Sequence, residues 1–204
     1  MKMFGHGFGD ENHLPWILLE YCQWNLNDVI NAMVDIQRIC SIIELSEAMH
    51  EIHSNGFIHL DLKPSNIFFD DSGHLKLGGI GNYHILDMKE QTEHQFISPE
   101  LLLGKQDSKE KSDVYSFGVI IFFILTSGEY PDISIVDKIN GKEPPIPKNI
   151  NKFSKEIILK CMSFNPKDRP TFENIINIIK NYKYNFIDGL EDKTQEIIDF
   201  IYKI

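Results

Sequence analysis

Apolar residues recur along most of this chain at the spacing of helices. Between Ile39 and Ile52 they lie three and four positions apart, which predicts a helix that ends before Gly56. The most apolar run, residues 114–125, predicts a helix that is buried on all sides. The same spacing predicts further helices near 133–140 and over 154–163 and 171–182.

Short apolar segments bounded by turn residues predict strands in two places. Residues 1–8 and 16–21 each favour a strand, with a polar loop between them. Residues 66–69 and 74–77 favour a second pair of strands around the turn sequence DDSG. The polar stretch 79–112 predicts a loop. We therefore expect an α+β protein, mainly α, in which a helical body carries small β elements.

The C-terminal segment, residues 191–204, has its apolar residues on one helical face. These residues are Ile197, Ile198, Ile201 and Ile204. We expect this helix to dock on the body, and the alternative is an interaction helix that binds a partner.

Composition narrows the classes of function. The 204 residues favour one domain, with 42% hydrophobic and 25% charged residues. A net charge of −10 argues against nucleic acid or an anionic membrane as partner. Three widely spaced cysteines without a CxxC suit a reducing compartment, with neither disulfides nor a zinc site. The N-terminus lacks the apolar stretch of a signal peptide, and the 12-residue run 114–125 is shorter than the roughly 20 residues of a membrane span. We expect a soluble, cytoplasmic protein.

The segment HLDLKPSNIFFD, residues 59–70, carries the candidate chemistry. It resembles the catalytic loop of eukaryotic protein kinases, of the Ser/Thr or tyrosine-kinase-like type. The resemblance implies that Asp61 accepts the proton of the substrate hydroxyl and that Lys63 compensates developing phosphate charge. It also implies that Asn66 ligates magnesium and that His59 is a structural residue facing the core.

Other motifs follow in the order of that family. The sequence Leu-Glu-Tyr-Cys at 19–22 resembles the hinge that binds adenine, and Ser-Pro-Glu at 98–100 resembles the A-P-E motif. DVYSFG at 113–118 resembles the start of the central buried helix, and residues 161–171 match a motif near the domain end. The resemblance implies a nucleotide site at Leu19, Glu20 and Cys22, with Phe68 as its floor. It also implies structural roles for Asp113, whose carboxylate bonds the catalytic loop, and for Glu100 and Arg169, which form an ion pair.

The resemblance also implies the domain organisation. The kinase-like domain covers 1–182: an N-lobe remnant at 1–21, a hinge at 20–25 and a C-lobe at 26–182. Residues 183–204 are an extension. Only 15 residues precede the strand 16–21, which leaves no room for the Gly-rich loop, the strand-three Lys or the Glu of the αC helix. We therefore expect a truncated N-lobe.

Three departures from the family pattern bear on catalysis. The D-F-G motif falls on Gly79-Ile80-Gly81, so that Gly79 replaces the principal magnesium ligand. Leu60 replaces the Arg of H-R-D. Glu93 stands where the family has Thr, and Thr92 is one position early.

Together these features predict a catalytically deficient, pseudokinase-like protein that acts as a protein-binding module without a cofactor. Asp61, Lys63 and Asn66 would then be retained for loop architecture. One alternative is a Ser/Thr-type kinase that uses ATP and magnesium to phosphorylate protein hydroxyls, its N-lobe missing from the gene model. Another is a decayed gene product without function. His50 and His53 are spaced to share a metal, although hydrogen-bonding or exposed histidines are the favoured interpretation.

Overall fold

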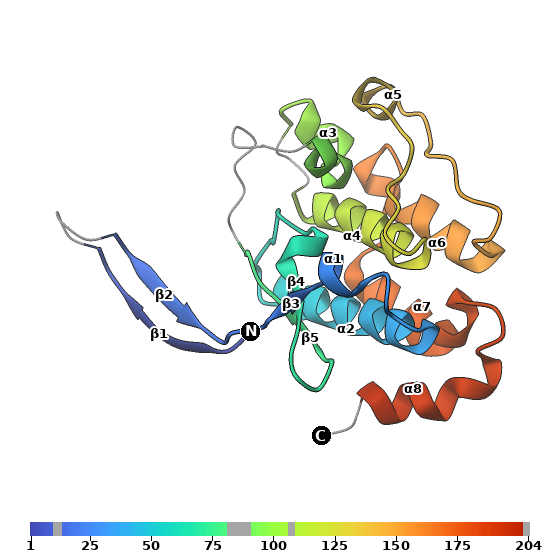
Figure 1. Cartoon of the computed structure of the whole chain (residues 1–204). Coiled ribbons are helices and arrows are strands. Elements are labelled where there is room, and N and C mark those ends of the chain that lie inside the picture. The colour runs from blue at the N-terminus through green and yellow to red at the C-terminus, as the bar shows by residue number, and fades with distance from the viewer. Residues whose placement is uncertain (10–13, 81–90, 106–108, 202–204) are drawn as a thin grey trace.

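The computed structural model describes residues 1–9, 14–80, 91–105 and 109–201, without the side chains of residues 91–93, 183, 184 and 191. It is mainly helical with two small sheets, as the sequence predicted. Figure 1 shows a helical body from which a two-stranded hairpin projects near the N-terminus. In the described part of the chain, every helix is too short or too polar to cross a membrane.

The body is built around a buried helix. Its four main helices are α2 (Asp35–Ser54), α4 (Lys109–Leu125), α6 (Lys152–Cys161) and α7 (Phe172–Tyr182). Helix α4 packs on α2 and α6, and α2 also packs on α7. The predicted burial of α4 is confirmed, because every residue from Ser112 to Ile124 is buried. Gly118 permits the close approach of α6, since a Cβ at this position would lie 2.7 Å from the Cβ of Cys161.

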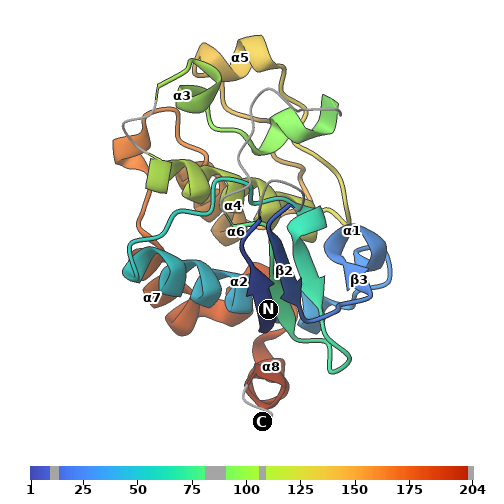
Figure 2. The same ribbon diagram turned by 90° about the vertical axis from the view of Figure 1, so that its left-hand side faces the viewer.

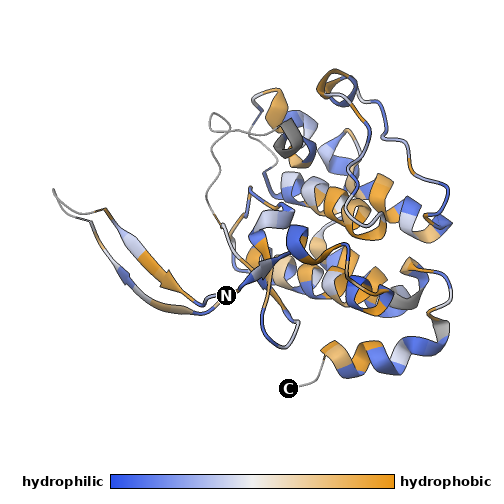
Figure 3. Cartoon of the chain, viewed as in Figure 1, coloured by the Kyte–Doolittle hydropathy of each residue, from blue (hydrophilic) through white to orange (hydrophobic). Residues whose placement is uncertain are grey.

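The projecting hairpin consists of β1 (Met3–Gly7) and β2 (Trp16–Leu19), both predicted from the sequence. The strands are antiparallel, with Gly7 opposite Trp16, and form a sheet of their own. Each strand therefore leaves one edge unpaired. All four residues of β2 are exposed although all are apolar. Figure 3 shows this apolar strand lying outside the body.

Smaller elements surround the helices. The second sheet has the order β3-β4-β5, and the predicted hairpin at 66–69 and 74–77 is present in it as β4 and β5. The elements are β3 (Trp24–Asn25), α1 (Leu26–Val29), η1 (Pro64–Asn66), β4 (Ile67–Phe69), β5 (Leu75–Leu77), α3 (Pro99–Leu102), α5 (Ile135–Ile139) and η4 (Pro166–Asp168).

The prediction that 79–112 is a loop was wrong in part. The 3₁₀ helix η3 (Gln91–Phe96), α3 and the first turn of α4 lie within it. Helix α3 is too short to produce an apolar period, and it begins at Pro99, a residue suited to the first helical turn. Strand β3 has only two residues and gives no pattern either.

The predicted C-terminal helix is present as α8 (Thr194–Ile201), after the 3₁₀ helices η5 (Lys183–Phe186) and η6 (Glu191–Lys193). It packs against α2, and Ile197 is fully buried. Phe200 contacts the ring of His74. This placement favours a helix docked on the body over a free interaction helix. Figure 2 shows α8 below α2 from a second direction; Ile204 lies outside the described residues.

A buried ion pair joins α3 to the segment before α7. The guanidinium of Arg169 contacts both carboxylate oxygens of Glu100, Nη1–Oε1 at 2.6 Å and Nη2–Oε2 at 2.8 Å. Arg169 is 2% exposed and Glu100 is 7% exposed. Arg169 also donates to the carbonyls of Lys111, Ser163 and Phe164. Burial alone would raise the pKa of Glu100, but hydrogen bonds and charge from Arg169 hold that pKa below its ordinary value.

The exposed hairpin leads to a first prediction. A two-stranded hairpin without a packed face is marginally stable in water. We expect the amides of residues 1–18 to exchange quickly in the isolated chain, while those of α4 stay protected. Hydrogen–deuterium exchange with peptide-level mass spectrometry measures both regions in one experiment. Protection of β1 and β2 equal to that of α4 would contradict the prediction.

The ion pair leads to a second prediction. Arg169→Ala leaves the Glu100 carboxylate buried without its cationic partner and with only the Ser112 hydroxyl donating to it, so we expect a loss of about 3–5 kcal/mol in the free energy of unfolding. Urea denaturation of both proteins measures the loss. The control is Lys193→Ala, which removes a partner from the exposed pair with Glu196 and should cost less than about 1 kcal/mol. Equal stabilities of the Arg169→Ala variant and the native chain would refute the prediction.

Candidate active site

One carboxylate of α4 holds the loop between α2 and β4 by accepting hydrogen bonds from its backbone. Asp113, 1% exposed, accepts hydrogen bonds from the backbone amides of His59 (2.8 Å) and Leu60 (2.7 Å). It also accepts one from Nε2 of His53 at 2.9 Å. Leu60 has φ of +65°, a left-handed conformation that costs a non-glycine residue roughly 1–3 kcal/mol. The bonds to Asp113 offset this strain and fix the direction in which the chain leaves Leu60.

His59 links the two halves of the site through its ring. The ring is fully buried, and burial lowers its pKa. Its Nδ1 accepts a bond from the amide of Asp61 (3.2 Å), so Nε2 carries the proton that is donated to the carbonyl of Gly78 (2.9 Å). A neutral His59 therefore ties the loop to the end of β5.

The structure brings Asp61, Lys63 and Asn66 together at the end of this loop. The Nζ of Lys63 lies 3.2 Å from Oδ1 of Asp61. Asn66 donates from Nδ2 to Oδ2 of Asp61 (2.8 Å) and to its backbone carbonyl (2.7 Å). Both oxygens of the Asp61 carboxylate thus have a partner within the protein. The three side chains form a compact group that is about one quarter exposed at Asp61 and Lys63.

Gly79 lies directly beside this group. It has φ of +79°, and a Cβ at this position would lie 2.6 Å from Cγ and Nδ2 of Asn66. The carboxamide of Asn66 therefore fills the space that a side chain at position 79 would enter. Only a glycine fits here with Asn66 in its present rotamer.

These residues do not fit a magnesium ion. Magnesium in proteins takes oxygen ligands in octahedral geometry, usually with one or two carboxylates. Here one carboxylate, that of Asp61, is already paired with Lys63 and Asn66, and Gly79 offers none. Within the described ranges, no group of three or more His, Cys, Asp or Glu side chains could hold a metal ion.

The residues predicted for a nucleotide site are divided between the hairpin, the chain that follows it and the second sheet. Leu19, at the end of β2, is 42% exposed. The amide of Glu20 is bonded to the carbonyl of Lys2 at 2.7 Å, so it is not available to a ligand in this arrangement. Burial, and then the charge of Glu20, raise the pKa of the Cys22 thiol. Phe68, in β4, packs against the backbone of Gly78.

Other predicted positions have simple outcomes. His53 bonds Asp113 and packs edge-on against Phe172, which agrees with a hydrogen-bonding rather than a metal-ligating histidine. The side chains of Thr92 and Glu93 lie outside what the structure describes, as does Gly81.

Sequence reasoning missed Lys138 of α5. This side chain is buried, and its ammonium donates to three carbonyls of the segment that leads into α3. These are the carbonyls of His94 (2.9 Å), Gln95 (2.9 Å) and Ile97 (3.2 Å). Desolvation by burial lowers the pKa of Lys138 to about 7. No sequence signal marks this residue, because lysines on short helices are normally exposed.

Known proteins that are similar to this chain are protein kinases, in agreement with the helical fold and with the motif at residues 59–70. The family model described as protein kinase domain matches residues 4–179. The chain is 27% identical over 193 residues to the serine/threonine/tyrosine-protein kinase HT1 of Arabidopsis thaliana, covering 85% of this chain and 49% of that protein.

Two further relatives are matched over a smaller share of their length. A probable serine/threonine-protein kinase of Dictyostelium discoideum is 26% identical, covering 82% of this chain and 13% of that protein. The mitogen-activated protein kinase kinase kinase dlk-1 of Caenorhabditis elegans is 29% identical, covering 88% and 21%. The chain thus spans about half or less of the length of each of these relatives. Because the family model covers most of its residues, the chain belongs to the protein kinase domain family.

Proposed function

We propose that this kinase lobe does not transfer phosphate and that it acts as a protein-binding module. The observation that carries the first half is Gly79. It stands where the family has its principal magnesium ligand, and the adjacent space is filled by the carboxamide of Asn66. Neither group supplies the negative charge that holds a divalent cation.

The size of the expected defect follows from the role of the metal. Metal ions contribute several kcal/mol to stabilising the charge of a phosphoryl-transfer transition state. At about 1.4 kcal/mol per tenfold change, their loss lowers the rate roughly a thousandfold or more. The protein has no replacement for this charge among the described residues near Asp61.

The retained residues are accounted for without catalysis. Asn66 bonds both the side chain and the backbone of Asp61, and Lys63 neutralises the carboxylate. These contacts close the turn that leads into β4. Substitutions of Asp61, Lys63 or Asn66 would therefore loosen the loop whether or not it is catalytic. Protein binding depends on surfaces elsewhere on the lobe, and the loss of phosphoryl transfer leaves those surfaces intact.

A second candidate function is a Ser/Thr-type kinase that transfers the γ-phosphate of ATP to protein hydroxyls. The grouping of Asp61, Lys63 and Asn66 favours it, as do the names of the relatives. The relatives are longer than this chain. A test of kinase activity would therefore compare this chain with a longer protein that includes any sequence upstream of Met1. ATP and magnesium would be its cofactors.

Ligand-dependent stability distinguishes the two candidates. A ligand that binds the native state raises the free energy of unfolding by RT ln(1 + [L]/Kd), about 2.7 kcal/mol at one hundred times Kd. We expect no magnesium-dependent rise in melting temperature when ATP is added at millimolar concentration. Magnesium alone and ATP with EDTA are the controls. A rise that requires both ATP and magnesium would overturn the proposal in favour of the kinase.

Two substitutions at position 79 test the cause of the defect. Gly79→Asp restores a carboxylate, and Gly79→Asn has nearly the same shape and no charge. Both must push the Asn66 carboxamide aside and adopt a left-handed backbone, so we expect each to lose about 1–2 kcal/mol of stability. Only Gly79→Asp should then be stabilised by millimolar magnesium in thermal unfolding. The same response from both variants, or from neither, would contradict the assignment of the deficit to the missing carboxylate.

A further inference from the structure

A cleft of about 550 Å³ lies between α3 and the segment that precedes α7, and none of its lining residues belongs to the Asp61 site. It is lined by Pro99, Glu100, Leu103, Lys105, Phe164, Asn165, Pro166 and Lys167. Its volume is in the range of clefts that accept a side chain together with some of its neighbours.

The walls of the cleft are apolar and remain partly exposed. Leu103 is 46% exposed and Phe164 is 47% exposed, one from each wall. The ring of Phe164 is supported from one side by Gly141, where a Cβ would lie 3.3 Å from the ring. Exposed apolar side chains that face a concave surface are typical of binding sites rather than of ordinary protein surface.

The walls are also held in a fixed relation. Arg169 bonds Glu100 beside the first wall and donates to the carbonyls of Ser163 and Phe164 in the second. A site that is already in its bound shape loses less conformational freedom when a ligand enters.

Two lysines give the cleft its charge. Lys105 and Lys167 line it and are exposed, and neither forms an ion pair with a described residue. The carboxylate in the lining is that of Glu100, which is paired with Nη1 and Nη2 of Arg169. Asp168, which is next to Lys167 in the chain, is exposed but is not part of the lining.

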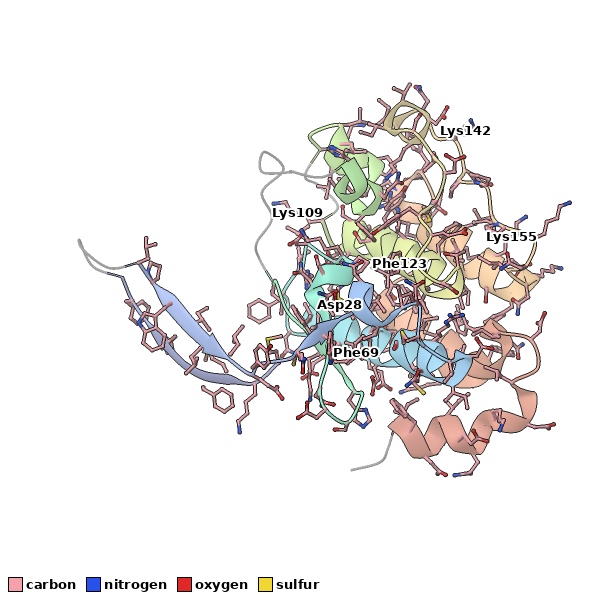
Figure 4. All side chains as sticks on the ribbon, in the orientation of Figure 1. Asp28, Phe69, Lys109, Phe123, Lys142 and Lys155 are labelled. Carbon is pink, nitrogen blue, oxygen red and sulfur yellow. The ribbon has the colours of Figure 1, made fainter. Side chains whose placement is uncertain are left out.

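The chain that leads to the second wall has more exposed lysines than exposed carboxylates, although the whole protein is acidic. Residues 142–168 contain six exposed Lys and three exposed Asp or Glu, whereas the full chain contains 20 Lys or Arg and 30 Asp or Glu. Lys152, Lys155 and Lys160 lie on the exposed side of α6, opposite its buried isoleucines. Figure 4 shows Lys142, which pairs with Asp137, just after α5, and Lys155 extending from α6.

We propose that this cleft binds an acidic segment of a partner protein. One apolar side chain of the segment lies between Leu103 and Phe164, and carboxylates of the segment lie beside Lys105 and Lys167. Charge complementarity favours an anionic ligand, and the apolar walls favour one with a hydrophobic side chain. The net charge of −10 disfavours long polyanions such as nucleic acid, which need a more extended cationic surface. The inference rests on the protein-binding half of the proposed function and names the class of partner.

The test uses the full chain and a fluorescein-labelled heptapeptide that has phenylalanine flanked by three glutamates on each side. Fluorescence anisotropy at low salt should give saturable binding that weakens as salt is added. Replacing the phenylalanine with alanine should weaken binding at least fivefold. A peptide with lysines in place of the glutamates should not bind.

Paired charge reversals locate the site. Lys105→Glu with Lys167→Glu should weaken binding of the glutamate peptide at least tenfold. Lys2→Glu with Lys180→Glu changes the net charge equally at exposed residues outside the cleft and should leave binding within about twofold. Equal losses in the two double variants, no saturable binding, or equal binding of the alanine peptide would each overturn the proposal.

Vesicles of phosphatidylserine serve as the second probe. Binding of the native chain to these vesicles, if abolished by Lys105→Glu with Lys167→Glu, would reassign the cleft to a membrane surface and overturn the protein ligand. Failure of the peptide experiment leaves the magnesium and ATP titrations unchanged, because these measure a different part of the lobe. The two proposals can therefore fail separately.

Discussion

The buried ion pair between Arg169 and Glu100 is the contact on which the arrangement of this lobe depends. It joins residues 69 positions apart and brings α3, the start of α4 and the segment before α7 to one point. A charge buried without a partner is strongly destabilising, so these three segments hold their places together. The same contact sets the distance between the two walls of the cleft that lies between α3 and the segment before α7.

Asp113 acts in a comparable way on the loop that carries Asp61. It satisfies the amides of His59 and Leu60 from the core side, and His59 then connects Asp61 to Gly78. Every one of these bonds is internal to the protein. The geometry of the loop is thus fixed by contacts within the protein, and these contacts are compatible with the glycine at position 79.

Much of this was predictable because it depends on local pattern. The run 114–125 is apolar on every face, and this places α4 in the core without further information. The resemblance to protein kinases, in which the D-F-G motif follows the catalytic Asp by roughly eighteen positions, places the metal position at Gly79. The turn of Asn66 toward Gly79 was not predictable, because it depends on a side-chain rotamer set by three-dimensional packing. Lys138 was hidden for the same reason, since its three acceptors lie more than forty residues away in sequence.

Net charge illustrates a different limit of composition. The net charge of −10 determines the electrostatic field far from the protein, where the contributions of individual positive and negative side chains are not distinguished. A ligand within one Debye length, roughly 8–10 Å, responds to the charged side chains beside it. In the cleft between α3 and the segment before α7, these are Lys105 and Lys167. Phosphoryl transfer requires opposite charges placed within tenths of an ångström at one site, whereas binding requires only a complementary surface. A glycine at position 79, in place of the metal-binding Asp of the family, can therefore remove phosphoryl transfer and leave a binding surface elsewhere unaffected.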